Sequence, residues 1–272
     1  MNTRSWRVTA ALLTVAAPFV AAHDFFLRPT AFDVAADTTI TIPALNGTFS
    51  TSANIVGAER LTALVVVRNG VRDSLPRRAW GPGADSTAQV TVRTGAPGRL
   101  VVGVETAPRV LALDGNAFNA YLADDGIPDE LAARRRDGTA NDSTRESYAK
   151  SAKTILRVGA GPSTGWDAQL GHEVELVPLR DPYVARPGQR LRLRALSRGA
   201  PLAGQIVVAG GRRTDGTRIP AQTVRTDADG IATIRLSHAG QWYAKFIRMR
   251  RTAPGDTLTH ESRWASLTFG IR

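Results

Sequence analysis

The sequence predicts a mostly-β protein of two antiparallel β-sandwich domains joined by a two-helix segment. Short runs such as 38–42 and 190–194 alternate apolar and polar residues with the period of two that is typical of half-buried strands. Turn-forming residues are frequent, with 25 glycines and 15 prolines among 272 residues. Helix signals gather in one central stretch only. Apolar residues make up 43% of the chain, enough for a sizeable core, and there is no cysteine, so disulfides and thiolate metal clusters are excluded.

Residues 1–22 have the pattern of a secretory signal peptide. Arg4 and Arg7 precede an apolar run over residues 8–20, and Val20-Ala21-Ala22 supplies small residues for a cleavage site. The run is shorter than the ~20 residues that a membrane-spanning helix needs. No second long apolar stretch follows it. We therefore expect a mature chain that starts at His23, lies in the periplasm or cell envelope, and has no integral membrane segment after cleavage.

The N-terminal sandwich is expected over residues 23–117. Its strand signals are short β-rich or alternating runs. The turn Asn69-Gly70 follows one of these runs, and Pro97-Gly98 precedes another. The expected strands are 38–42, 64–67, 89–92 and 99–104.

The segment 118–165 is expected to be a helical connector. Pro128 opens a helix with acidic residues in its first turn, and a run of arginines at 134–136 ends it before Gly138. Ser143 and Glu146 have the spacing of a capping box, which predicts a second helix. The apolar residues that follow at helical spacing are Tyr148, Ala152, Ile155 and Leu156.

The C-terminal sandwich is expected over residues 166–272. The run 190–194 alternates leucine with arginine, and Asp227 to Gly230 predicts a tight turn between strands. The expected strands are 173–177, 190–196, 205–208, 223–226, 231–236, 242–247 and 264–271. The order of turns and strands over residues 187–247 resembles transthyretin-like and carboxypeptidase-regulatory-like β-sandwiches, a resemblance that concerns fold more than function.

Several sequence islands together resemble one family of exported bacterial proteins, domain-of-unknown-function family 4198. The islands are residues 23–29 (HDFFLRP), 118–122 (FNAYL), 145–153 (RESYAKSAK), 175–183 (ELVPLRDPY) and 261–269 (ESRWASLTF). They run from the expected mature start almost to the end of the sequence. The resemblance implies the periplasmic component of a cobalt or nickel uptake system. One position departs from it, because Arg248 precedes Met249 where the resemblance leads us to expect a histidine.

Four histidines are the main candidates for metal binding, and His23 is the most informative of them. Cleavage after Ala22 would give His23 a free α-amine, which can chelate a metal together with its own imidazole. Copper(II) and nickel(II) favour such nitrogen ligands. His260 or His172 could supply a third nitrogen, as in a copper brace. Asp24 and Glu261 could add oxygen ligands or orient an imidazole.

The formal net charge of +11 is compatible with several classes of partner. Because the chain is expected to be exported, we expect no nucleic acid as partner, whereas an anionic envelope polymer fits the charge. The sequence has no nucleophile elbow, no HExxH zinc motif and no phosphate-binding glycine loop, so we expect no enzyme of those classes.

Three functions follow, in order of preference. The first is a periplasmic, non-enzymatic protein that binds divalent nickel, cobalt or copper or assists its uptake, with a membrane transporter as partner. The second is a structural or adhesive envelope module that binds a polymer or a protein. The third is an oxidative enzyme with a copper brace at His23.

Overall fold

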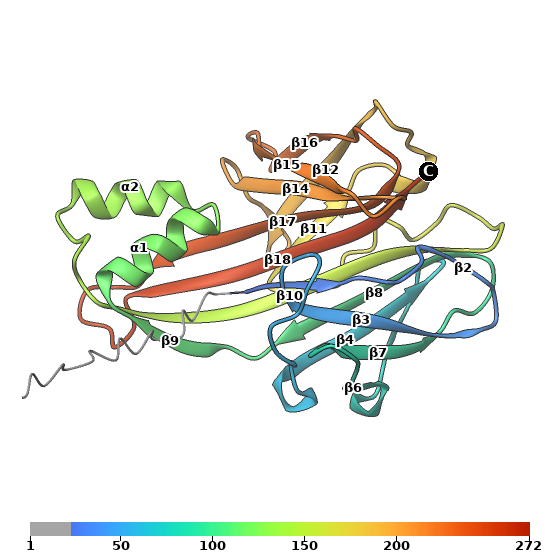
Figure 1. Cartoon of the computed structure of the whole chain (residues 1–272), viewed down its shortest axis with the longest axis horizontal. Helices are drawn as coiled ribbons and strands as arrows, with labels where there is room; N and C mark the ends of the chain where they lie inside the picture. The colour runs from blue at the N-terminus through green and yellow to red at the C-terminus, as the bar shows by residue number, and fades with distance from the viewer. Residues whose placement is uncertain (1–22) are drawn as a thin grey trace, which may run out of the picture.

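Three β-sheets form the body of the protein (Figure 1). The computed structural model describes residues 23–272, so the expected signal peptide lies outside the described residues. The N-terminal sheet has the order β1 (Asp24–Leu27), β3 (Thr39–Gly47), β7 (Ala88–Arg93) and β6 (Trp80–Pro82). The C-terminal sheet contains β11 (Val174–Pro178), β12 (Arg190–Ser197), β13 (Ala200–Pro201) and β16 (Ile231–Arg235).

The largest sheet, here called the central sheet, has ten strands. Its main path is β15 (Arg218–Arg225), β14 (Ile206–Arg213), β17 (Gly240–Arg251), β18 (His260–Ile271), β10 (Thr144–Val158), β8 (Gly98–Thr106), β4 (Leu61–Arg68) and β5 (Val71–Ser74). Two short strands, β2 (Asp33–Val34) and β9 (Arg109–Leu113), also pair with β10. Each strand expected from the sequence overlaps an observed strand, and the mostly-β class is confirmed.

The two sandwiches share the central sheet, because its middle strands are buried on both faces. On β4, Leu64 and Val66 belong to the apolar core under the N-terminal sheet. Their neighbours Val65 and Val67 belong to the core under the C-terminal sheet. A strand covered on both faces has no polar side, which explains the unbroken apolar run at 64–67. The division of the chain at residues 117 and 166 stays a prediction.

The second expected helix is wrong, because residues 144–158 form β10, a strand inside the central sheet. The apolar positions Tyr148, Ala152 and Leu156 are four residues apart. That spacing fits one face of a helix, but it also places every member on one face of a strand, whose side chains alternate with period two. Several polar residues of β10 are paired by tertiary contacts that the local sequence does not reveal. Glu146, for example, accepts hydrogen bonds from Tyr121 and Ser262.

The central sheet is also not wholly antiparallel. β10 runs parallel to β18, with Lys150 opposite Trp264 and Thr154 opposite Thr268. The long excursion through the C-terminal sheet between these strands makes this pairing possible, because a parallel pair needs a long crossover connection.

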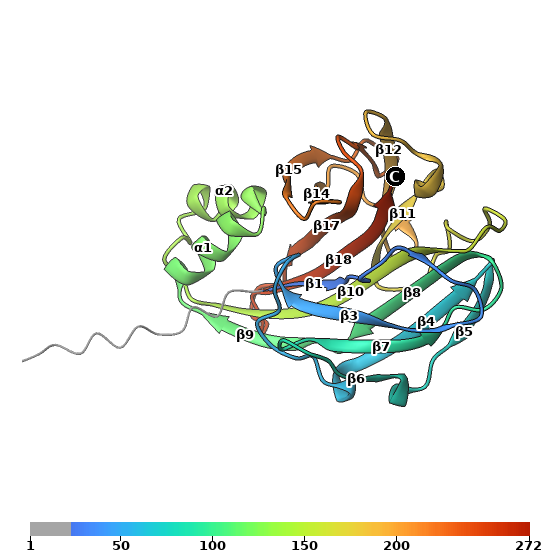
Figure 2. The same ribbon diagram turned by 45° about the vertical axis from the view of Figure 1, so that its right-hand side comes forward.

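Two α-helices extend from one end of the central sheet (Figures 1 and 2). α2 (Pro128–Arg136) is the first expected helix and has the predicted proline, acidic and arginine positions. α1 (Gly115–Asp124) was not predicted as a helix; Asp114 caps it by accepting a hydrogen bond from the backbone N–H of Ala117 at 2.8 Å. A third apolar cluster fixes both helices on β17 and β18, with the buried residues Phe118, Tyr121, Leu122, Ile127, Ile247 and Trp264. Within residues 23–272, no helix has the length and apolar character needed to cross a membrane.

Candidate functional site

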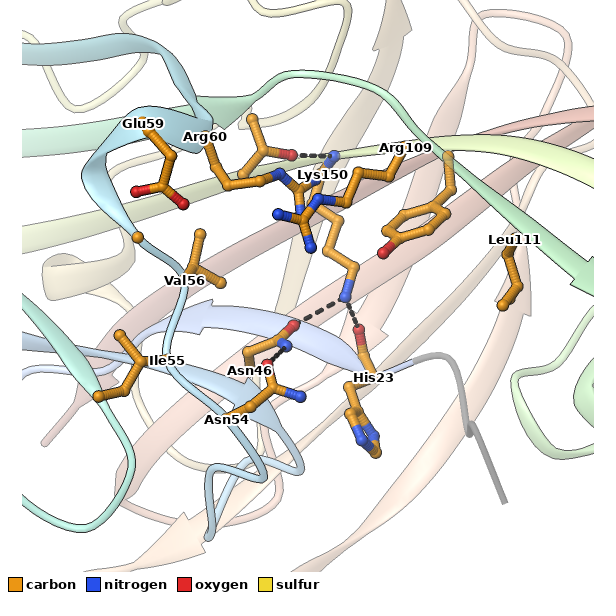
Figure 3. Close-up of a pocket in the computed structure, with 13 residues that line it drawn as sticks. His23, Asn46, Asn54, Ile55, Val56, Glu59, Arg60, Arg109, Leu111 and Lys150 are labelled. Carbon is orange, nitrogen blue, oxygen red and sulfur yellow. Dashed lines mark hydrogen bonds between the residues drawn. The ribbon is translucent and has the colours of Figure 1, made fainter. Parts of the chain in front are cut away.

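A pocket of about 520 Å³ opens beside the start of β1, where the mature chain is expected to begin (Figure 3). His23 directly precedes β1, and Asn46 lies near the end of β3. Arg60 ends the short 3-10 helix η1 (Ala58–Arg60). Arg109 comes from β9, and Lys150 comes from β10 in the middle of the central sheet. The pocket therefore joins segments from the N-terminal and central sheets.

Lys150 forms the floor of this pocket and is buried, with 6% of its surface exposed. Its ammonium group donates to the backbone carbonyl oxygen of His23 and, at 2.7 Å, to Oδ1 of Asn46. It also lies 5.3 Å from the ring centre of Trp264, where the π face stabilises a cation. Burial lowers the pKa of Lys150 to about 8; Asp24 opposes this change.

Two arginines face Lys150 across the pocket (Figure 3). Arg60 donates from Nη2 to the carbonyl oxygen of Ala107 at 2.9 Å, while its buried Nε has no hydrogen-bond partner within residues 23–272. Burial and the nearby Arg109 guanidinium lower the pKa of Arg60. In the described part of the chain, neither arginine nor Lys150 forms a salt bridge.

His23 lies at the rim of the pocket, and its ring points away from the ammonium group of Lys150 (Figure 3). Partial burial lowers the pKa of His23, and the charge of Lys150 lowers it further, while Asp24 acts in the opposite direction. The imidazole is therefore mostly neutral at neutral pH, which is the form that binds metals. In the described part of the chain, its ring nitrogens make no hydrogen bond.

Asp24 is adjacent to His23 in sequence, but its carboxylate is already engaged. Both of its oxygens accept hydrogen bonds from Lys245, at 2.6 and 2.7 Å. Asp125 lies on the other side of Lys245, with 3.8 Å between Oδ1 and Nζ. Burial raises the pKa of Asp125 to about 7.

His260 and Glu261 are the first two residues of β18, and His260 lies under the two helices. His260 is buried, its Nε2 lies 3.2 Å from Oε1 of Glu130, and its ring packs against Phe118. It precedes Trp264, the β18 neighbour of Lys150, by four residues, or ~13 Å along an extended strand. Glu261 pairs with Arg250. The two side chains point to opposite faces of β18, and the structure brings neither of them to His23.

His172 lies on the opposite face of the central sheet. Its ring approaches Gly103, which shares a strand face with Val101 of the core under the C-terminal sheet. It is 3% exposed, and neither ring nitrogen has a hydrogen-bond partner within residues 23–272. Burial, and to a smaller extent the charge of Lys153, lower the pKa of His172 to about 4.

Across residues 23–272, no group of three or more His, Asp or Glu side chains has the arrangement of a metal site. The metal roles of His23, Asp24, His172, His260 and Glu261 stay predictions. Sequence reasoning missed the three cations of the pocket, Arg60, Arg109 and Lys150. Lys150 could have been noticed as a charge inside a central strand, but only if 144–158 had been assigned to a strand.

Comparisons with known proteins give one extended match. The family described as "Domain of unknown function (DUF4198)" matches residues 20–249. No curated protein matches the chain. Among solved structures, the tetra-tandem repeat in the extending region of a large adhesion protein is 12% identical with a TM-score of 0.22, and the match covers 91% of this chain and 49% of that one. The BSP domain of a biofilm associated protein is 10% identical with a TM-score of 0.20, covering 90% of this chain and 29% of that one. The chain thus spans half or less of these structures, and such low TM-scores carry no argument about function.

Proposed function

The chain belongs to the family of the domain of unknown function DUF4198, and from this premise we propose that its mature form is a non-enzymatic periplasmic protein that binds a divalent nickel, cobalt or copper ion for uptake. The observation that carries the proposal is the open position and free ring of His23. Its imidazole lies at the rim of an open pocket, is not used in a hydrogen bond among the described residues, and has a lowered pKa. A neutral imidazole binds a metal ion without first losing a proton.

Cleavage after Ala22 would add the α-amine of His23 as a second nitrogen ligand. Amine and imidazole belong to one residue, so they can chelate one ion without help from a distant strand. Nickel(II) and copper(II) favour such nitrogen ligands over the oxygen ligands preferred by magnesium and calcium. With Asp24 held by Lys245, the other coordination positions are left for water, a small molecule or a side chain of a membrane transporter. A site with exchangeable positions suits an ion that is bound and then passed on.

The test is a calorimetric titration of the mature protein with nickel, cobalt and copper. Mass spectrometry first establishes that the exported chain starts at His23. We expect one equivalent of metal, and an affinity at least ~10-fold lower in a His23→Ala variant. His238→Ala is the matched control, because this histidine does not line the pocket and its ring forms a hydrogen bond only with Ser237 among the described residues. Equal affinity in the wild-type protein and the His23→Ala variant would refute the proposal, as would the absence of binding in both.

The two alternatives make different predictions. An oxidative copper enzyme should produce peroxide in a copper-dependent reaction that the His23→Ala variant lacks. A structural or adhesive module should retain a polymer or protein from envelope extract regardless of metal.

A further inference from the structure

We infer that the pocket beside His23 binds a small organic anion with two or more carboxylates, held by Arg60, Arg109 and Lys150. Among residues 23–272, three positive side chains line this pocket, and Glu59 is its only acidic lining residue. In the described part of the chain, none of the three cations has a carboxylate partner.

Among the other buried basic groups of the described residues, Arg99 and Lys153 have such partners, whereas Arg134 donates only to uncharged oxygens. The buried Arg99 donates to Asp181 from Nε at 2.8 Å and from Nη2 at 2.6 Å. The buried Lys153 pairs with Glu175 at 2.6 Å. Lys150 is equally enclosed, yet its hydrogen-bond acceptors are a backbone carbonyl and an amide oxygen, both uncharged. A buried charge without a directly bonded counter-ion is costly, and a bound anion would supply one to Lys150.

Free hydrogen-bond donors point to the same conclusion. An ammonium group has three donors, and two of those of Lys150 are used within residues 23–272. The Nε of Arg60 is buried and has no partner in that part of the chain. A buried donor normally finds an acceptor. The guanidinium groups of Arg60 and Arg109 lie next to each other in the pocket (Figure 3), and a bound anion would relieve their mutual repulsion.

The shape and walls of the pocket favour an organic anion over a bare inorganic one. Ile55, Val56, Leu111 and the ring of Tyr148 line it together with the cations. A volume of about 520 Å³ exceeds what a single phosphate ion fills. A planar guanidinium group binds a carboxylate through two parallel hydrogen bonds, and the neighbouring arginines offer two such forks. The ligand class that fits is a carbon chain carrying several carboxylates.

The same ligand would also promote metal binding at His23, an effect that rests on the proposed function. Positive side chains beside His23 repel a bare dication, whereas a polycarboxylate in the pocket would neutralise them. Its oxygens could then occupy the coordination positions of a metal on His23 that the described residues leave open. The substrate would be a metal bound to an anionic chelator. Binding of the anion itself requires no metal.

The test uses the mature protein without metal, with citrate as the probe in calorimetric titrations. We expect citrate to bind, with an affinity that falls as sodium chloride is raised, because the contacts are ionic. Arg60→Gln and Arg109→Gln should each lower the affinity at least ~10-fold. Arg190→Gln is the control, since it removes the same charge from an exposed position on β12 in the C-terminal sheet and should change the affinity less than twofold. Arg109 is exposed on the short strand β9, so its substitution leaves the core intact.

Absence of citrate binding by the wild-type protein would overturn the inference, as would equal binding by the wild-type protein and the Arg109→Gln variant. Phosphate binding as tight as citrate binding would overturn the assignment to an organic polycarboxylate. A nickel titration separates this inference from the proposed function. If citrate binding depends on Arg109 and nickel does not bind with or without citrate, the anion site is supported and the metal function is refuted. If nickel binding depends on His23 and citrate does not bind, the metal function is supported and the anion site is refuted.

Discussion

Replacing Lys153 by methionine should strongly destabilise the fold, because it breaks a buried ion pair between the central and C-terminal sheets. Lys153 on β10 donates to Oε2 of Glu175 on β11 at 2.6 Å, and the two side chains are 2% and 3% exposed. Glu175 also accepts hydrogen bonds from the backbone N–H groups of Leu170 and Gly171. Burial alone would raise the pKa of Glu175, but Lys153 and these donors outweigh it and hold the pKa below its usual value.

The size of the effect follows from this geometry. At 2.6 Å and an effective dielectric constant of about 20, the Coulomb attraction is about 6 kcal/mol, and its loss leaves a desolvated carboxylate. The backbone donors stay in place, and Glu175 can take up a proton, so both limit the cost. Measured losses for breaking one side of a buried pair are about 3–5 kcal/mol. That is a large share of the ~5–15 kcal/mol by which folded domains are stable.

Urea unfolding at pH 7 is the assay. With a slope of about 3 kcal/mol per molar urea, Lys153→Met should lower the unfolding midpoint by ~1–2 M. The control is the double variant Lys153→Met with Glu175→Gln, which removes the uncompensated charge and should recover part of the loss. Because the folded-state pKa of Glu175 is lowered, its stabilising contribution is present above its unfolded pKa of ~4.3 and is lost as the pH falls below it. The difference between the wild-type protein and the single variant should therefore shrink below pH 4. A loss under 1 kcal/mol at pH 7, or a double variant less stable than the single one, would contradict the reasoning.

Three further predictions follow from other parts of the structure. Burial raises the pKa of Asp125 to about 7, so the ionised side chain costs stability above that pH. Asp125→Asn should therefore stabilise the protein by at most about 4 kcal/mol at pH 9 and by nothing below pH 4. Urea unfolding across this pH range measures the difference. Gly103→Ala should cost ~1–3 kcal/mol in the same assay, because its Cβ would lie 2.1 Å from Cδ1 of Leu170; an unchanged midpoint would mean that this side chain moves freely. His260→Gln should leave nickel affinity within about twofold of wild type in calorimetry, because this histidine lies with Glu130 at the start of β18; a larger loss would restore it as a ligand.

The sequence predicted the strands well because their signal is local. The alternation at 190–194 reflects burial of one strand face, and the apolar run at 64–67 reflects burial of both faces. Both patterns are visible in consecutive residues of the sequence. The segment 144–158 failed for a physical reason. Four-residue spacing of Tyr148, Ala152 and Leu156 satisfies a helix and a strand equally, and only pairing with β8 and β18 decides between them.

The candidate site was predictable only in part. His23 was singled out from the expected cleavage site, and the structure gives it an open position at the rim of a pocket. Arg60, Arg109 and Lys150 are spread over some 90 residues and no local pattern links them, so their convergence appears only in the fold. His172 and His260 are candidates because either could supply a third nitrogen from a neighbouring strand. The sequence does not show which face or end of a sheet each histidine occupies, and the structure places both away from His23.

The central claim is that the freed amine and the imidazole of His23 bind one metal ion together. Its most direct test compares nickel affinity of the mature chain starting at His23 with that of the same chain acetylated on its α-amine, by calorimetry under identical conditions. Acetylation turns the amine into an amide, adds no new amine and leaves every side chain from His23 to Arg272 unchanged. We predict a loss of affinity of at least ~10-fold in the acetylated chain. Equal affinities in the two chains would contradict the claim.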